Sequence, residues 1–165
     1  MSGHDPIILK SEIRSQLEVL ESLYVGFEDL LRQEFAQLGK TRGTALMVAG
    51  IIENYYTCAE TLFLRVSHYF ENNLDEKHWH RDLLFKMQLS IADIRIPVIN
   101  QETFLHLQEL LRFRHFKRYY YQLDYDWDQL DFLVCKLKKV HPLLTANVQA
   151  FVTFLDSLID SLEPQ

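Results

Sequence analysis

Glycine, proline and cysteine are all scarce in this chain of 165 residues. Its 5 glycines and 4 prolines leave little material for turns, which favours a few long elements over many short ones. The two cysteines, Cys58 and Cys135, have no CxxC spacing and no cluster of metal ligands around them. This pattern argues against a disulfide framework or a zinc site and predicts two buried thiols in a reducing compartment.

The sequence also lacks segments that indicate export or membrane insertion. Its N-terminus has no basic region followed by an apolar run, so we expect no signal peptide. No uninterrupted apolar stretch approaches the roughly 20 residues that a membrane-spanning helix needs. Hydrophobic residues make up 48% and charged residues 24% of the chain, the balance of an ordinary soluble protein. We therefore expect a single domain over residues 1–165, located in the cytoplasm, with no membrane contact.

Helical periodicity dominates what is present, and no strand candidate of convincing length remains. Apolar residues at steps of three and four predict a long first helix that Gly39 ends, and a second long helix after it. The first stripe consists of Ile13, Leu17, Leu20, Tyr24, Phe27, Leu31, Phe35 and Leu38, and the second of Val48, Ile52, Tyr55, Ala59, Leu62, Val66 and Tyr69. Two long helices joined by a short loop predict an antiparallel hairpin.

The second half of the chain continues the helical pattern. We predict a shorter helix over residues 79–91, an extended connector over residues 93–100, and a further helix that Asn100 caps. Another helix begins at Trp127, and Pro142 predicts that it is interrupted and that a separate terminal helix starts there. The predicted fold class is therefore all-α, an up-and-down bundle of five or six helices.

Two short motifs suggest ligands but have the wrong context. The GKT sequence that begins at Gly39 lacks the earlier glycine of a phosphate-binding loop, because Glu34 occupies that position, and it follows a helix. His78 and His80 could share a metal ion, but residues two apart on a helix point about 200° away from each other. We expect no metal site and no cofactor.

The most distinctive stretch is the basic segment, defined here as residues 112–121. It is concentrated in a chain of formal net charge −6, and it contains Arg112, Arg114, His115, Lys117 and Arg118, followed by Tyr119, Tyr120 and Tyr121. The apolar stripe of Phe104, Leu107 and Leu111 continues onto Arg114. Because a bare charge is costly to bury, this predicts an arginine carried into a packed or dimer-facing surface.

Three functional interpretations of the basic segment are open: phosphate binding, acid–base chemistry and a docking surface. Arginine and lysine supply donors and charge for phosphate, and tyrosines can stack on exposed bases. The structural alternative is a basic helix end, favourable with the helix dipole, beside core tyrosines. Glu53 and Asn54 form a polar pair in an apolar helix, which either orients a catalytic arginine from a neighbouring helix or faces solvent.

The segments RFRHFKRYYYQLDYDWDQLDFL, IIENYYTCAETLFLRV and WHRDLLFKM resemble the HepT-like group of the HEPN superfamily, from roughly residue 48 to the C-terminus. Members of that group are helical bundles that usually dimerise, and many are metal-independent endoribonucleases. These endoribonucleases act as the toxin of a toxin–antitoxin pair with a small MNT-type nucleotidyltransferase. The catalytic motif of the group is an arginine, four to six residues, then a histidine, often followed after one further residue by a tyrosine.

The resemblance places the motif arginine at Arg114 and the final tyrosine at Tyr121, whereas the histidine position holds Tyr119. The implied chemistry is attack of a ribose 2′-hydroxyl on the adjacent phosphate, which needs a proton-transferring group and a cation. Tyrosine is a poor base at neutral pH, so His115 is the histidine that could substitute. The implied catalytic residues are Arg114, His115 and Tyr119, and the implied phosphate-binding residues are Arg112, Lys117 and Arg118.

The resemblance also implies partners: RNA as substrate, an MNT-type nucleotidyltransferase as antitoxin, and a second copy of the chain. Residues five apart on one helix point about 140° apart, so a shared arginine–histidine site fits a helix end or a dimer interface. Tyr121 is implied as the acceptor of AMP from the nucleotidyltransferase, and a core tyrosine is the alternative. The alternative is a catalytically degenerate bundle that only binds the nucleotidyltransferase; Tyr119 favours this alternative, whereas Arg114, Arg118 and Tyr121 favour the ribonuclease. A generic helical interaction module would explain the fold but not the basic segment.

Overall fold

The computed structural model describes residues 5–71, 74, 77–119 and 124–162, with residues 118 and 119 described by their backbone alone. Within these residues the structure contains six helices and an isolated bridge between Ile91 and Arg95. The helices are α1 (Pro6–Arg32), α2 (Glu34–Leu38), α3 (Arg42–Phe70), α4 (Trp79–Met87), α5 (Gln101–Tyr119) and α6 (Trp127–Leu162). The predicted all-α bundle is confirmed.

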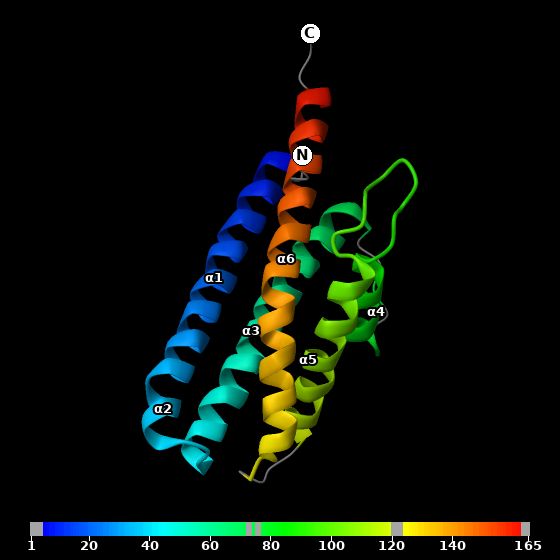
Figure 1. Ribbon diagram of the computed structural model, residues 1–165. Coiled ribbons are helices and arrows are strands. Elements are labelled where there is room, and N and C mark those ends of the chain that lie inside the picture. Colours follow the sequence, from blue (N-terminus) through cyan, green and yellow to red (C-terminus); the bar gives the residue numbers. More distant parts are fainter. Residues whose placement is uncertain (1–4, 72–73, 75–76, 120–123, 163–165) are drawn as a thin grey trace.

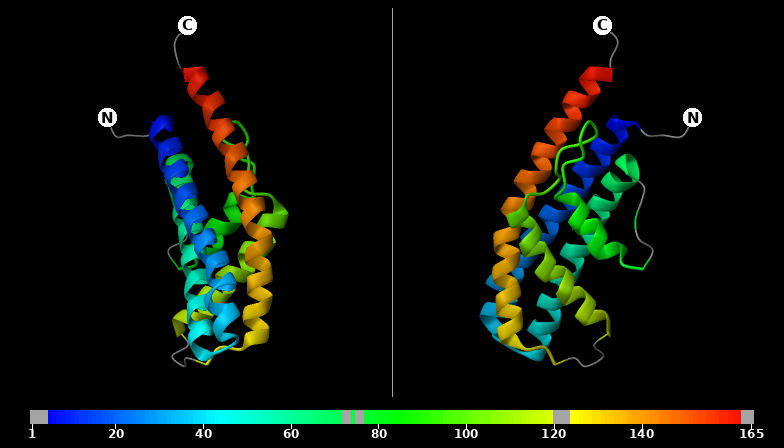
Figure 2. Two further views of the ribbon diagram at one scale, coloured as in Figure 1. Left: turned by 60° about the vertical axis from the view of Figure 1, so that its left-hand side comes forward. Right: turned by 90° about the vertical axis from the view of Figure 1, so that its right-hand side faces the viewer.

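The four long helices run in alternating directions, as an up-and-down bundle requires (Figure 1). Helices α1 and α3 form the predicted antiparallel hairpin, and α6 lies along both of them. Helix α5 packs against α3 and α6, while the short α4 lies beside α3 and α5 on the outside of the bundle (Figure 2). Residues 112–117 of the basic segment, whose side chains the structure describes, therefore lie on a helix that packs against both α3 and α4.

Capping side chains fix the starts of three helices. Asp5 accepts a hydrogen bond from the backbone N–H of Ile7 at 2.8 Å, ahead of Pro6 in the first turn of α1. Thr41 and Thr44 form a reciprocal capping box at the start of α3. Asn100 accepts from the N–H of Thr103 at 2.9 Å, as predicted for the start of α5. Gly39, at φ 68°, caps α2 in a conformation that favours glycine.

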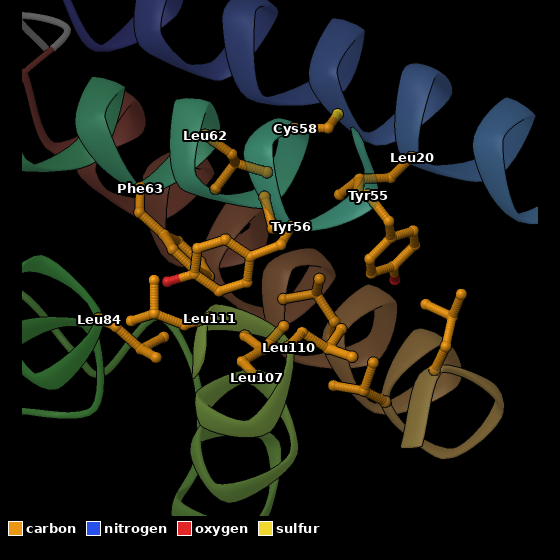
Figure 3. Close-up of a cluster of buried hydrophobic side chains, with 14 of the residues drawn as sticks. Leu20, Tyr55, Tyr56, Cys58, Leu62, Phe63, Leu84, Leu107, Leu110 and Leu111 are labelled. Carbon is orange, nitrogen blue, oxygen red and sulfur yellow. The ribbon is translucent and has the colours of Figure 1, made fainter. Parts of the chain in front are cut away.

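The core is built from the apolar stripes that the sequence predicts. Figure 3 shows Tyr55, Tyr56, Leu62 and Phe63 of α3 on one side and Leu107, Leu110 and Leu111 of α5 on the other. Cys58 is buried, but Cys135 is exposed, so the prediction of two buried thiols is wrong for Cys135. Cys135 lies two residues beyond the buried Leu133, and that spacing turns a helical residue to the opposite face.

The predicted break at Pro142 is wrong, because α6 continues through it to Leu162. An interior proline removes one helical hydrogen bond and crowds the preceding turn, at a cost of about 3 kcal/mol. Here Val140 and Leu144 are buried on either side of the proline, and His141 is buried beside Tyr55. Pro142 itself is exposed, so water can reach the carbonyl that loses its partner. Tertiary contacts thus outweigh the local cost.

Three boundaries also differ from the predictions. The first helix breaks at Gln33, and after the break Phe35 of α2 contacts Trp127 with ring centroids 5.4 Å apart. Helix α4 ends at Met87 instead of residue 91, and the connector after it folds into a turn with Asp93 at φ 60°. The buried guanidinium of Arg95 stabilises this turn by donating to backbone carbonyls and to the carboxylate of Glu71. Turn prediction from sequence relies on the residues within the turn and their immediate neighbours. It could not predict a turn that is stabilised by the buried guanidinium of Arg95.

By length and composition alone, α6 is apolar enough to cross a membrane. Its buried residues fall on one stripe that faces the other helices, whereas lysines and aspartates occupy other positions. A core helix with an amphipathic pattern passes the same compositional test. In this structure α6 supplies one wall of the bundle core.

Candidate functional site

Arg114 lies entirely inside the protomer, with 1% of its side chain exposed. It continues the stripe of α5 that faces α3, and both Nη atoms of its guanidinium donate hydrogen bonds to the carboxylate of Glu60. The Nη1–Oε1 distance is 2.9 Å and the Nη2–Oε2 distance is 2.8 Å. Nη1 also donates to the hydroxyl of Thr57 at 3.2 Å. The sequence-based prediction that charge enters a packed surface is confirmed, and that surface belongs to α3.

An aromatic ring completes the surroundings of this guanidinium. Its central carbon lies 4.8 Å from the ring centroid of Tyr56, which favours the cation through the π face. Burial raises the pKa of the Tyr56 hydroxyl, and Glu60 raises it further while Arg114 opposes the shift. Tyr56 therefore stays protonated and cannot serve as a base near neutral pH. Among the described residues, neither its hydroxyl nor Nε of Arg114 has a hydrogen-bond partner.

His80 of α4 joins the same ion pair from a third helix. Its Nδ1 lies 2.7 Å from Oε2 of Glu60 and 2.9 Å from Nη2 of Arg114. A single ring nitrogen can satisfy only one of these neighbours at a time: protonated, it donates to Glu60, and unprotonated, it accepts from Arg114. We call Thr57, Glu60, His80 and Arg114 the Arg114 cluster.

His115 follows Arg114 in sequence but faces α4. Its ring centroid lies 5.4 Å from that of His80, with the rings nearly perpendicular at 79°. His115 also lines a cleft of about 580 Å³ between α4 and α5. The residues that line this α4–α5 cleft are His78, Arg81, Asp82, Leu84, Phe85, Phe104, Gln108, Leu111, Arg112 and His115.

The charges of the α4–α5 cleft are predominantly positive. Asp82 is the one carboxylate among its described lining residues, and it pairs with Lys86 at 2.9 Å. Arg112 pairs with Glu109 on the surface, a contact that contributes little because the arginine is 65% exposed. Arg81 has no ion-pair partner in the part of the chain that the structure describes. Among the described residues, the cleft therefore presents two arginines whose charges are little neutralised by neighbouring carboxylates.

The other predicted site residues are spread over several surfaces. Lys117 pairs with Glu53, and both side chains are partly exposed. Asn54 is exposed. The side chains of Arg118 and Tyr119 and the whole of Tyr121 lie outside the described residues. The structure thus brings His115 and Arg112 together in the cleft, with Arg114 buried behind it and Lys117 elsewhere.

Sequence reasoning missed Glu60 and His80. The role considered for Glu53, orienting an arginine from another helix, belongs to Glu60, which lies two turns further along α3. A usable signal was present, because Glu60 stands between Tyr56 and Phe63 on the apolar face and an acid buried there requires a cation. No such signal marked His80, since its partners come from two other helices. Within the described residues, no group of three potential metal ligands is found.

A helical bundle is the architecture that the resemblance implied, and the structure is such a bundle, with Arg114 on α5. A family model described as HepT-like protein matches residues 47–155, from the first turns of α3 to the last turns of α6. The match covers well over half of the chain, and the chain therefore belongs to the HepT-like protein family. No curated protein and no solved structure gives a significant match.

Proposed function

We propose that this HepT-like protein is the toxin of a toxin–antitoxin pair, a homodimeric and metal-independent endoribonuclease whose antitoxin is an MNT-type nucleotidyltransferase. The observation that carries the proposal is the α4–α5 cleft. It gathers arginines and histidines beside aromatic rings in a chain whose formal net charge is −6. An acidic protein repels RNA over most of its surface, so a local cationic cleft is where RNA would bind.

The size and lining of the cleft suit a nucleotide within an RNA strand. Its volume of about 580 Å³ is in the range of small-molecule sites. Arg81 and Arg112 can each form paired hydrogen bonds to phosphate oxygens. Phe85 and Phe104, whose ring centroids lie 6.4 Å apart, offer faces for base stacking.

The proposed reaction needs proton transfer and charge stabilisation, and no covalent enzyme intermediate. Arg81 and Arg112 would stabilise the charge that develops on phosphorus-bound oxygens, and His115 would exchange a proton with the reacting groups. Arg114 takes a different role from the one its motif position implied. Because it is fully buried and bound to Glu60, it would position neighbouring groups without touching the phosphate.

Exposed apolar side chains on α5 support the proposal of a homodimer. Leu105 is 51% and Phe116 is 42% exposed, and residues eleven apart lie on nearly the same helical face. Phe85 of α4, at the cleft, is 50% exposed. Covering this face with a second copy would remove apolar surface from water and place two clefts near one interface.

One observation favours a second candidate, a catalytically degenerate bundle that only binds the nucleotidyltransferase. The bidentate Glu60 contact occupies the guanidinium that the family motif would offer to phosphate. With Tyr119 at the motif histidine, the linear motif then has neither group available for catalysis. In this candidate the α4–α5 cleft binds an acidic surface of the partner.

Cleavage of bulk tRNA and mRNA by the purified protein in EDTA separates the two candidates. We expect cleavage with 2′,3′-cyclic phosphate ends, and a loss of at least about tenfold in kcat/KM for Arg81→Ala/Arg112→Ala, because two phosphate contacts disappear. The matched control is Arg14→Ala/Arg32→Ala on α1, a helix that does not contact α4 or α5. A well-folded dimer that leaves RNA intact would refute the ribonuclease and support the degenerate binding partner.

A further inference from the structure

We infer that His80, held by Glu60, is a catalytic residue of the proposed RNA cleavage and transfers the proton that the motif histidine would carry. This inference rests on the proposed function. Position 119 holds a tyrosine, so the linear motif has no imidazole beside its arginine. The fold supplies one from α4, which lies against α3 and α5 (Figure 2).

The first step of the argument is the orientation of the ring. Glu60 is fixed by two hydrogen bonds from Arg114, and its Oε2 lies 2.7 Å from Nδ1 of His80. Of the two contacts at Nδ1 this is the shorter, so we assign the Nδ1 proton to it. The neutral ring then carries its lone pair on Nε2, and the carboxylate stabilises the cation formed when Nε2 takes up a proton.

The second step is access. Arg114 is 1% and Glu60 6% exposed at the side chain, whereas His80 is 18% exposed. Within this ion-paired group, His80 therefore has the best access to a ligand. The ring of Trp79 lies against it with centroids 3.6 Å apart and restricts its rotation. His80 is not itself a lining residue of the α4–α5 cleft, but its neighbour in sequence Arg81 and the adjacent ring of His115 both line it.

The third step is the pairing of two imidazoles. The ring centroids of His80 and His115 are 5.4 Å apart, which places two imidazoles side by side at the wall of the cleft that His115 lines. A general base and a general acid on one phosphate are what metal-independent cleavage requires. Among the described residues, the charged groups that contact His80 are Glu60 from α3 and Arg114 from α5, which also pair with each other.

The reaction then balances without a further reactant. Nε2 of His80 takes the proton of the ribose 2′-hydroxyl, and the O2′–P bond forms. The P–O5′ bond breaks, and O5′ receives a proton from the protonated ring of His115. The products are a 2′,3′-cyclic phosphate and a 5′-hydroxyl, while Arg81 and Arg112 hold the non-bridging oxygens.

The test compares single-turnover cleavage of a short RNA in EDTA by the wild type, His80→Gln and Glu60→Gln, with the melting temperature and RNA affinity of each. Glutamine keeps a donor toward Glu60 but cannot transfer a proton, so we expect kcat to fall at least about 100-fold with RNA affinity within about twofold. For Glu60→Gln, which removes the carboxylate that orients the ring, we expect kcat to fall at least about tenfold with RNA affinity nearly unchanged. A purely structural role of His80 would change the melting temperature and leave kcat of the folded variants in place.

A second measurement avoids variants that fail to fold. Diethyl pyrocarbonate modifies accessible imidazoles, and mass spectrometry can map the modified histidines of the wild type. We expect the extent of His80 modification to correlate with the loss of cleavage. An RNA made non-cleavable by a 2′-deoxy nucleotide at the cleavage position should protect His80 from modification. If the wild type cleaves RNA but His80→Gln retains its rate within about threefold, or modification of His80 leaves activity intact, the inference is overturned while the ribonuclease stands. If the wild type does not cleave at all, the proposed function fails and the inference fails with it.

Discussion

Replacing Arg114 by methionine removes one charge of the buried pair and keeps most of the side-chain volume. Glu60 is then left with a 6% exposed carboxylate that has lost its guanidinium partner and keeps the imidazole of His80 as a neighbour. Breaking a buried pair in this way costs about 3–5 kcal/mol, a large share of the about 5–15 kcal/mol that stabilises a typical domain. For a domain of this size, each kcal/mol corresponds to about 2–4 °C, so we expect the melting temperature to fall by roughly 6–20 °C.

A double-mutant cycle measured by urea unfolding separates the pair from other effects of substitution. Glu60→Leu should cost a similar amount, because it leaves the guanidinium buried without its counter-charge. The double variant Arg114→Met/Glu60→Leu removes both charges and should be more stable than either single variant, since apolar replacement of a buried pair is often neutral or stabilising. We expect a coupling energy of at least about 2 kcal/mol.

The exposed pair of Arg32 and Asp29 provides the control. Its side chains are 70% and 46% exposed, so Arg32→Met should cost less than about 1 kcal/mol. A loss below about 1 kcal/mol for Arg114→Met would show that water reaches the Arg114 cluster. A double variant whose loss equals the sum of the single losses would show that the two residues are not coupled. Either result would refute the reasoning.

Two further predictions concern α6 and α5. Pro142→Ala restores a backbone N–H within the continuous α6, so urea unfolding should show a gain of about 1–3 kcal/mol; a loss would mean that the helix requires the proline. The pKa of His106 is lowered, first by burial and then by Lys136, so the unfolded chain binds its proton first as pH falls below the ordinary 6.5. The stability that His106 contributes is therefore complete above that value and is lost on acidification, and His106→Gln should flatten the melting-temperature curve between about pH 5 and 7. Equal slopes for the two proteins would contradict this.

The helices were predictable because their buried faces repeat every three to four residues. The prediction failed where distant contacts overrode a local rule. Pro142 breaks an isolated helix, but buried neighbours on both sides keep α6 continuous. The turn after α4 depends on Arg95, whose donors reach carbonyls up to nine residues away in sequence. Such contacts are decided by the tertiary structure and leave no local pattern.

The candidate site was predictable only in part, because neighbours in sequence point in different directions on a helix. Each residue of α5 turns the side chain by about 100°, so Arg112, Arg114 and Lys117 reach the cleft, the core and Glu53 respectively. Residues that are close together in the basic segment therefore lie in three different environments. Glu60 and His80 contact Arg114 because three helices pack together. The spacing of these residues along the chain does not predict such contacts.

The buried pair of Arg114 and Glu60 also bears on how such a chain can evolve. Replacing either residue alone leaves an unpaired buried charge and destabilises the protein. Selection for folding removes such single variants, whether or not the protein cuts RNA. Selection for folding alone is therefore enough to keep the arginine and its partner together. An arginine at this position is therefore explained by its contribution to folding and is not by itself evidence of catalysis. The imidazoles are the residues whose presence bears on catalysis.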